Sequence, residues 1–198
     1  MIDFLYDTFL ALGERRGMRA RRRELLAGVR GRVLELGAGT GLNVPHYPHD
    51  VDLVLTEPDP AMRAGLERRL ARARRPATVV GAPAEALPFA DGTFDTVVST
   101  LVFCTVGDVP ATAREVRRVL APGGRLIFIE HVRASTPRLA AWQDRFAGPW
   151  RVVGQGCRCN QATLEQLERA GLRVGPVSRG RWHGMPALVH PLVVGEAS

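Results

Sequence analysis

The sequence from residue 33 to residue 41, Val-Leu-Glu-Leu-Gly-Ala-Gly-Thr-Gly, has the residue types and spacing of a ligand-binding loop. A short apolar run followed by alternating glycines is typical of a buried strand that turns tightly into a helix. Glycines let the backbone approach a ligand closely and direct free N–H groups toward it. We therefore expect a cofactor loop composed of Glu35, Gly37, Ala38, Gly39, Thr40 and Gly41.

Two classes of cofactor fit a loop of this kind. A dinucleotide site usually spaces its glycines G-x-G-x-x-G, whereas the third glycine here comes one residue early. Glu35 adds a carboxylate near the ligand, which suits a cationic group better than a phosphate. S-Adenosylmethionine carries a sulfonium and an ammonium group and no phosphate, so the loop favours it over NAD.

A second acidic group follows the next expected strand. The strand over 51–55 ends at Thr56-Glu57-Pro58-Asp59, about 20 positions after the first glycine of the loop. A carboxylate there can accept hydrogen bonds from both hydroxyls of a ribose, so we assign this role to Glu57, with Pro58 beside it. Met62, in the first turn of the following helix, is a candidate for packing on an adenine, and a core position is an equal alternative.

Two residues are candidates for catalysis. His131 follows an expected strand and could orient or deprotonate a substrate near neutral pH, or could instead cap the backbone. Asp144 lies on an expected helix that could cover the site. The aromatic residues of the same helix region, Trp142, Phe146 and Trp150, could wall an apolar pocket or belong to the core.

The chain has three cysteines, Cys104, Cys157 and Cys159. An odd number in a sequence without signal-peptide features predicts reduced thiols and a cytoplasmic location. Cys157 and Cys159 with His183 could suggest zinc, but a C-x-C spacing lacks a second pair of ligands, so we expect no metal. Cys157 could line a substrate pocket or be an inert buried thiol.

Strands alternate with helical patterns along the chain. Strands are expected at 33–36, 51–55, 77–80, 94–99, 125–130, 172–177 and 187–194, and helices at 2–12, 18–27, 61–75, 111–120, 137–149 and 161–170. This alternation predicts an α/β fold with a doubly wound parallel sheet, whose ligands bind at the carboxyl ends of the strands. The residues expected along that edge are Glu35, Glu57, Ala84, Thr100 and His131.

At 198 residues, the chain is expected to form a single domain. Residues 1–30 would be a helical cover, in which Tyr6 and Asp7 could touch ligand or pack. Residues 31–131 would form the cofactor-binding core, and residues 132–198 the substrate-side helices and the last two strands. No stretch approaches the roughly 20 apolar residues of a membrane span.

Four segments resemble class I S-adenosylmethionine-dependent methyltransferases of the small-molecule type. They are ELGAGTG (35–41), EPDPAM (57–62), AEALPFADGTFDTVVS (84–99) and EVRRVLAPGGRL (115–126). The resemblance implies a Rossmann-like sheet of seven strands, mostly parallel with one antiparallel C-terminal strand, and helices on both faces. It implies that Glu35 holds the methionine end of S-adenosylmethionine and Glu57 the ribose, and that Ala84, Glu85 and Thr100 contribute to the cofactor site. One departure is Pro83, where many members have Asp.

The C-terminal third is similar to enzymes that S-methylate alkyl thiols. The similar segments are Thr100-Leu101-Val102-Phe103-Cys104, Glu130-His131-Val132, Gly156-Cys157 and LEQLERA (164–170), with Trp142 and Trp150. This similarity implies methyl transfer to a small-molecule acceptor, with a thiol favoured. Two alternatives are a phospholipid N-methyltransferase and, because of Pro83, a regulatory protein that binds the cofactor without catalysis.

The basic residues are relevant to whether the protein binds a membrane or a nucleic acid. All 27 are arginines, and the net charge is +7. The absence of lysine suggests a coding bias, so we expect the arginines of residues 15–23 and 63–75 to be solvated helix faces, with peripheral contact to an anionic membrane as the alternative. Residues 99–102 lack the Asn/Asp-Pro-Pro-aromatic motif of enzymes that methylate base amines, and no RNA-binding module is recognisable, so no nucleic-acid partner is expected.

Overall fold

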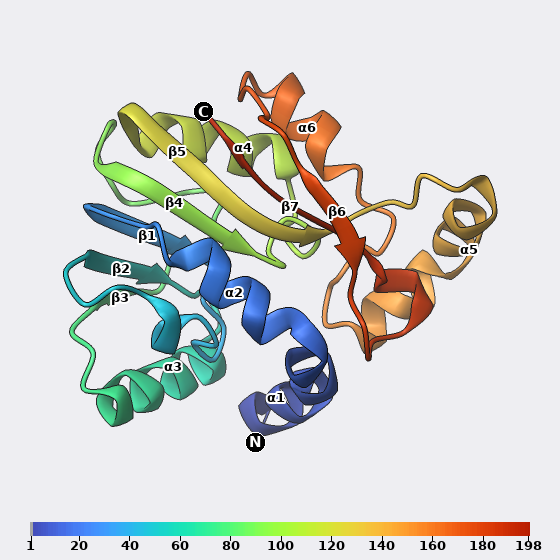
Figure 1. Ribbon diagram of the computed structural model, residues 1–198, viewed down its shortest axis with the longest axis horizontal. Coiled ribbons are helices and arrows are strands. Elements are labelled where there is room, and N and C mark those ends of the chain that lie inside the picture. The colour runs from blue at the N-terminus through green and yellow to red at the C-terminus, as the bar shows by residue number, and fades with distance from the viewer. Residues whose placement is uncertain (1) are drawn as a thin grey trace.

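A seven-stranded sheet lies between two layers of helices (Figure 1). The computed structural model describes residues 2–198, and the side chains from Asp7 onward. The strands are β1 (Arg32–Leu36), β2 (Asp52–Thr56), β3 (Thr78–Val80), β4 (Phe94–Thr100), β5 (Leu120–His131), β6 (Ser178–Arg181) and β7 (Pro191–Ala197), in the spatial order β3-β2-β1-β4-β5-β7-β6. Strands β1 to β5 pair in parallel, whereas β7 runs antiparallel to β5 and β6. The expected Rossmann-like sheet with one antiparallel C-terminal strand is confirmed.

The helices follow the expected order. They are α1 (Ile2–Gly13), a kinked segment η1 (Glu14–Met18), α2 (Arg19–Leu26), α3 (Pro60–Ala73), α4 (Val109–Val119), α5 (Pro137–Val153) and α6 (Thr163–Arg169), with the short 3₁₀ segments η2 (Val44–His46) and η3 (Ala187–Val189). Within the described part of the chain, none of these helices combines the length and the apolar character needed to cross a membrane.

Apolar residues of the strands form separate cores on the two faces of the sheet. Val33 of β1 belongs to a buried cluster that includes Leu26 of α2 and Leu66 of α3. The next residue, Leu34, belongs to the opposite cluster, which includes Val116 of α4 and Leu167 of α6. Successive side chains of a strand point to opposite faces, so β1 can be apolar along most of its length only because helices cover both sides.

The last two strands lie further along the chain than the sequence indicates. Strand β6 begins at Ser178, and within the expected range 172–177 only Val174 forms an isolated bridge, to Ala197. Residues 187–189 form η3, and β7 begins at Pro191. Among residues 2–198, strand β6 pairs only with β7, and it is exposed along its whole length. It therefore lacks the apolar pattern by which a buried strand is recognised.

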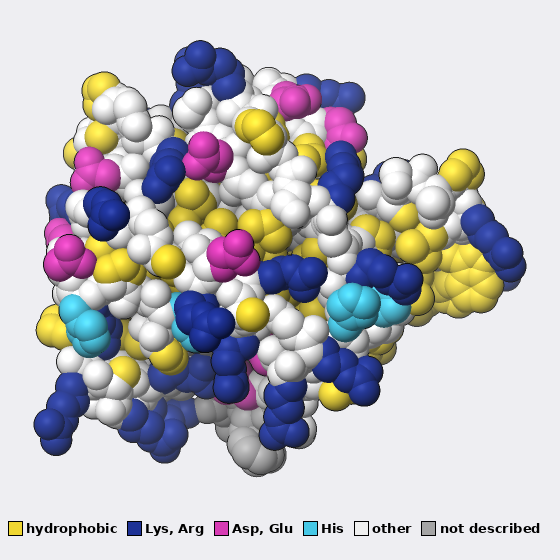
Figure 2. All heavy atoms as spheres, in the orientation of Figure 1, with side chains coloured by type: hydrophobic (Ala, Val, Ile, Leu, Met, Phe, Trp, Pro, Cys, Tyr) yellow, Lys and Arg dark blue, Asp and Glu magenta, His cyan; other side chains and the backbone are white. Residues whose placement is uncertain are grey.

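Arginines of the N-terminal helices mostly face solvent. Arg15, Arg16, Arg19 and Arg23 are exposed, and Figure 2 shows many basic side chains along the edge where α1, α2 and α3 lie in Figure 1. Arg22 is an exception, because it is buried and forms an ion pair with Glu14 at 3.0 Å.

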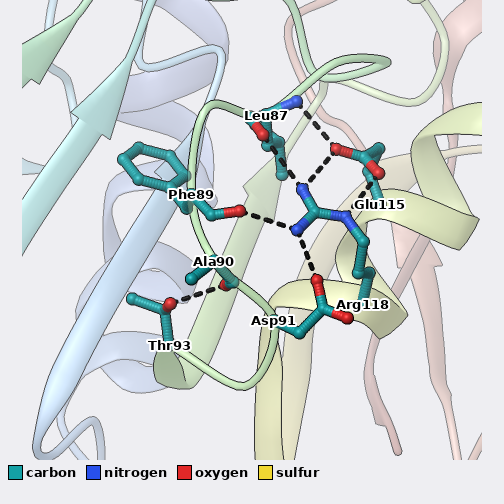
Figure 3. Close-up of polar contacts among 7 residues, drawn as sticks. All are labelled: Leu87, Phe89, Ala90, Asp91, Thr93, Glu115 and Arg118. Carbon is teal, nitrogen blue, oxygen red and sulfur yellow. Dashed lines mark hydrogen bonds and ion pairs between the residues drawn. The ribbon is translucent and has the colours of Figure 1, made fainter.

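One arginine fixes the loop between β3 and β4, which carries Ala84 and Glu85. The guanidinium group of Arg118 on α4 points into this loop (Figure 3). Its nitrogens donate to the carbonyl oxygens of Phe89 at 2.6 Å and Leu87 at 2.9 Å. The same group forms ion pairs with Glu115 and Asp91. A planar group with five donors can make these contacts together, so α4 determines the path of the loop.

Replacing Arg118 should therefore loosen this loop. We expect Arg118→Ala to lower the free energy of unfolding by about 2 kcal/mol, since hydrogen bonds and ion pairs to two carboxylates and two carbonyls are lost together. Urea denaturation measures this change, and limited proteolysis reports cleavage within residues 81–93. The exposed Arg114→Ala on the same helix is the control. Equal stability of the two variants would contradict this role of Arg118.

Candidate active site

A cavity of about 510 Å³ lies at the carboxyl ends of β1, β2, β4 and β5. Sheets of this topology bind ligands at this edge. The residues predicted for the site that line this cavity are Gly37, Gly39, Glu57, Pro58, Met62, Ala84, Glu85, Thr100 and His131. Pro83 also lines it, beside Ala84. The structure thus brings together most of the residues that the sequence indicates.

The glycine loop, residues 37–41, meets two different requirements. Gly39 has φ of 57°, and a Cβ atom there would meet nothing within 4 Å, so its backbone is open to a ligand in the cavity. Gly41 has φ of 85°, and a Cβ atom there would lie 2.7 Å from Leu66 of α3. The first glycine lets a ligand approach the backbone, and the second lets a helix approach it.

Glu57, just after β2, joins the glycine loop to the start of α3. Its carboxylate accepts hydrogen bonds from the backbone N–H of Gly39 at 2.7 Å and of Asp59 at 2.9 Å. Burial raises the pKa of Glu57, and these two hydrogen bonds oppose the rise. Each carboxylate oxygen keeps a free lone pair, and the group lines the cavity. This geometry fits a ribose, whose two hydroxyls need neighbouring acceptors.

Glu35 lies behind the cavity wall rather than in it. Its carboxylate is buried and accepts hydrogen bonds from Tyr47 Oη at 2.7 Å and Asn43 Nδ2 at 2.9 Å. The same Asn43 nitrogen lies 3.0 Å from the hydroxyl of Thr100, which lines the cavity. Burial raises the pKa of Glu35 to about 7. Glu35 can therefore act on a ligand through Asn43 and Thr100, and through its charge.

The other loop residues shape the site from outside it. Ala38, Thr40 and Gly41 do not line the cavity. The hydroxyl of Thr40 donates to Asp7 at 2.6 Å, and Asp7 also forms an ion pair with Arg69 at 2.6 Å, so α1 is fastened to both the loop and α3. The side chain of Tyr6 lies outside the described residues.

Two apolar residues of α1, Phe9 and Leu10, also line the cavity. The sequence did not indicate either residue as part of the site, although the apolar spacing of residues 2–12 predicted a covering helix. They place the N-terminal helix against the cavity, and Leu10 packs in the same buried cluster as Cys104 and Trp182.

Three donor atoms meet at the other end of the cavity, namely Cys104 Sγ, His131 Nε2 and Cys157 Sγ. The three atoms all lie within 4.8 Å of one another. His131 Nε2 lies 3.0 Å from Cys157 Sγ, and Trp150 Nε1 donates to the same sulfur at 3.1 Å. His131 Nδ1 is buried and has no hydrogen-bond partner among the described residues. The polar contacts of the imidazole are therefore directed to the sulfur-lined end.

The two thiols at this end differ in acidity. A hydrogen bond from Cys104, together with those from His131 and Trp150, lowers the pKa of Cys157. The same bond to Cys157 and burial raise the pKa of Cys104. Cys157 is thus the thiol that the site stabilises as a thiolate. The sequence suggested Cys157 as a pocket residue, and the structure adds Cys104, which comes from a different loop.

Asp144 lies outside the cavity. Its carboxylate forms a two-point ion pair with Arg133 and accepts a hydrogen bond from Asn160 at 3.0 Å, and these contacts lower its pKa to about 2. The structure does not bring this candidate base to the other site residues. Of the aromatic residues on α5, Trp150 lines the cavity, whereas Trp142 is 56% exposed and packs against Phe146.

Comparison with known proteins identifies the family. A methyltransferase-domain family model matches residues 34–128. Human thiol S-methyltransferase TMT1B is 39% identical over 78% of this chain and 68% of its own length. The chain belongs to the S-adenosylmethionine-dependent methyltransferases. A phosphatidylethanolamine N-methyltransferase from Cereibacter sphaeroides is 33% identical over 59% of each chain.

A solved structure agrees on the fold of this methyltransferase. The S-adenosylmethionine-dependent methyltransferase TM1293 from Thermotoga maritima, described as a possible histamine N-methyltransferase, superposes with a TM-score of 0.71. It is 21% identical, and the match covers 98% of this chain and 93% of that one. The open backbone at Gly39 and the Glu57 carboxylate fit S-adenosylmethionine as cofactor. Membership of an enzyme family also favours catalysis over the regulatory alternative.

We expect Glu57→Ala to weaken binding of S-adenosylmethionine and S-adenosylhomocysteine by about 10- to 100-fold. The variant loses acceptors for the ribose and the hydrogen bond that holds Gly39, and hydrogen bonds to a charged group are worth about 1.5–3 kcal/mol. Isothermal titration calorimetry measures both affinities. Asp52→Ala is the control, because Asp52 lies at the opposite end of β2 in an exposed ion pair with Arg32. Wild-type affinity in the Glu57 variant would refute the assignment.

Glu35→Gln should flatten the pH dependence of stability. The pKa of Glu35 is about 7 in the folded protein, against 4.5 for an ordinary glutamate. The folded state therefore binds more protons between these values. The stabilisation by protonated Glu35 is complete below about pH 4.5 and is lost as the pH rises through about 7. The two pKa values differ by about 2.5, which corresponds to about 3 kcal/mol of folding free energy as an order of magnitude.

Urea denaturation between about pH 5 and about pH 8 measures this effect. The wild type should lose stability over the range, and the loss should be smaller in Glu35→Gln, whose amide resembles the protonated carboxyl group. The exposed Glu24→Gln is the control and should keep the wild-type slope. A Glu35→Gln slope equal to that of the wild type would show that Glu35 does not titrate in this way.

Proposed function

We propose that the protein transfers a methyl group from S-adenosylmethionine to the sulfur of a small, apolar thiol. The observation that carries the proposal is the composition of the far end of the cavity. Beyond Thr100, the cavity is lined by Cys104, His131 and Cys157 together with the apolar residues Trp150, Trp182, Met185 and Val189. The relation to TMT1B, whose name specifies a thiol acceptor, supports the same acceptor.

The residues of this chain would act mainly by positioning the cofactor and the acceptor thiol. Bound S-adenosylmethionine supplies an electrophilic methyl group on a sulfonium. The glycine loop and Glu57 would hold the cofactor, and Phe9 and Leu10 would cover the cavity, which keeps water away. An ordinary thiol has a pKa of about 8.5, so modest stabilisation of the thiolate is sufficient at neutral pH. The acceptor thiol would lie beside Cys104 and Cys157, and His131 would take its proton as the sulfur attacks the methyl group.

The domain organisation follows from these roles. Residues 1–30 would cover the cofactor, residues 31–131 would bind it, and residues 132–198 would build the acceptor side. The contacts of α1 with the glycine loop and of Trp150 and Cys157 with the cavity support this division. We also propose a cytoplasmic location, in keeping with three reduced, buried cysteines.

Phospholipid N-methylation is the alternative function. The relative from Cereibacter sphaeroides and the exposed arginines of α2 and η1 support it, because arginines on a helix can contact anionic headgroups. A phospholipid acceptor would require that the cavity open toward the membrane surface that these arginines contact.

Turnover with different acceptors tests the proposal. We expect S-adenosylhomocysteine and an S-methyl product, detected by mass spectrometry, with apolar alkyl thiols and not with amines or phenols. His131→Asn should lower kcat by about 100-fold, because loss of a group that assists proton transfer typically costs this much, while cofactor affinity stays unchanged. Asp144→Asn is the matched control outside the cavity. Turnover with phosphatidylethanolamine vesicles and not with thiols would overturn the proposal in favour of the lipid enzyme.

A further inference from the structure

The acceptor end of the cavity has the composition of a metal site. Two thiol sulfurs and one imidazole nitrogen, from Cys104, Cys157 and His131, converge within 4.8 Å of one another. All three residues are buried, with exposed fractions of 2%, 8% and 1% respectively. Such donors are soft or intermediate ligands, which select zinc over magnesium or calcium.

The three donors are held by separate, well-connected segments. His131 ends β5, and the next residue, Val132, donates its N–H to Pro191 at the start of β7. The loops that carry Cys104 and Cys157 are joined by a backbone hydrogen bond of 2.7 Å from Arg158 to Cys104. A site that is rigid before metal binds needs this kind of support, because ligand geometry must be maintained without the ion.

Helix α5 also supports the loop that carries Cys157. Gln143 of α5 is fully buried, and its Nε2 lies 2.8 Å from the carbonyl oxygen of Cys159. Trp150 Nε1 donates to the Cys157 sulfur at 3.1 Å. Hydrogen bonds to a ligating thiolate orient it and balance its charge, so Trp150 fits the role of an outer partner of a metal ligand.

We propose that Cys104 Sγ, Cys157 Sγ and His131 Nε2 bind one zinc ion, with the fourth coordination position facing the cavity. Tetrahedral zinc, with bonds of about 2.3 Å to sulfur and about 2.0 Å to nitrogen, separates its ligand atoms by roughly 3.5–3.8 Å. The observed contact of 3.0 Å between His131 and Cys157 would need to open by less than about 1 Å. Two thiolates and a divalent cation sum to zero charge, which suits a buried site.

This site differs from the one that the sequence suggests. Among the described residues, Cys157, Cys159 and His183 do not form a group of metal ligands, and the Cys159 sulfur lies 3.6 Å from the carbonyl oxygen of Gln143. The expectation of no metal rested on that pair alone. Cys104 supplies the missing ligand from a loop more than fifty residues earlier in the chain.

The consequence for catalysis rests on the proposed thiol function. Three protein ligands with one open position are typical of catalytic rather than structural zinc sites. All three ligands line the cavity that also contains Thr100 and Gly39, so an acceptor sulfur could occupy the open position. His131 would then be a ligand, and the ion would favour the thiolate form of the acceptor.

Metal analysis tests the proposal without relying on turnover. The full chain is purified under reducing conditions, dialysed, and supplied with zinc or cobalt. We expect one zinc per chain by elemental mass spectrometry, and a thiolate-to-cobalt charge-transfer band. Cys104→Ser and Cys157→Ser should each weaken zinc binding by more than about 100-fold. Cys159→Ser, which alters a neighbouring buried thiol outside the triangle, should bind as the wild type does.

The outcomes separate the metal site from the proposed function. Calorimetric binding of S-adenosylhomocysteine by each variant shows that it is folded. Three results would each overturn the metal proposal. They are the absence of zinc binding by folded wild-type protein, a loss of zinc affinity in Cys159→Ser equal to that in the ligand variants, and a Cys104–Cys157 disulfide under the same reducing conditions. Zinc binding without thiol turnover would support the metal site and refute thiol methylation. Thiol turnover by wild-type protein that binds no added zinc would refute the metal site and support thiol methylation.

Discussion

The buried carboxylate of Glu130 determines the geometry of the acceptor side. One of its oxygens accepts hydrogen bonds from the Ser99 hydroxyl at 2.7 Å and from the backbone N–H groups of Val102 at 2.9 Å and Phe103 at 3.3 Å. The residue is fully buried, and burial raises its pKa to about 7. These donors all belong to β4 or the turn that follows it, so a side chain of β5 dictates the path of the neighbouring segment.

The position of the sulfur-lined end follows from this contact. Leu101, in the turn that Glu130 organises, has φ of 61°, a conformation that is unfavourable for a residue with a Cβ atom. The turn places Cys104 beside His131, which is the next residue after Glu130. Glu57 acts in the same way on the cofactor side, where it holds the N–H of Gly39. At both ends of the cavity, a carboxylate at the end of one strand orders the backbone that follows another.

The sequence revealed the cofactor side better than the acceptor side, for a physical reason. The glycine loop and Glu57 are local signals, because tight turns and helix starts need particular residues at fixed spacing. The sulfur-lined end combines Cys104, His131 and Cys157, which are far apart in the sequence and come together only when the sheet has formed. No short sequence motif predicts this cluster. The sequence places Asp144 on a helix but gives no sign of Arg133, whose ion pair holds the carboxylate outside the cavity. The expected position of strand β6 was wrong because an exposed edge strand has no apolar pattern in its sequence.

The apolar character of the acceptor end has a role of its own for the proposed reaction. A thiolate and a sulfonium combine to give neutral products, so charge disappears as the transition state forms. A polar, water-filled site would stabilise the separated charges most and would therefore raise the barrier. The walls formed by Trp150, Trp182, Met185 and Val189 remove that stabilisation. A neutral site of two thiolates and one zinc ion would preserve this environment, whereas an additional fixed carboxylate in the cavity would compete with the acceptor for the cation.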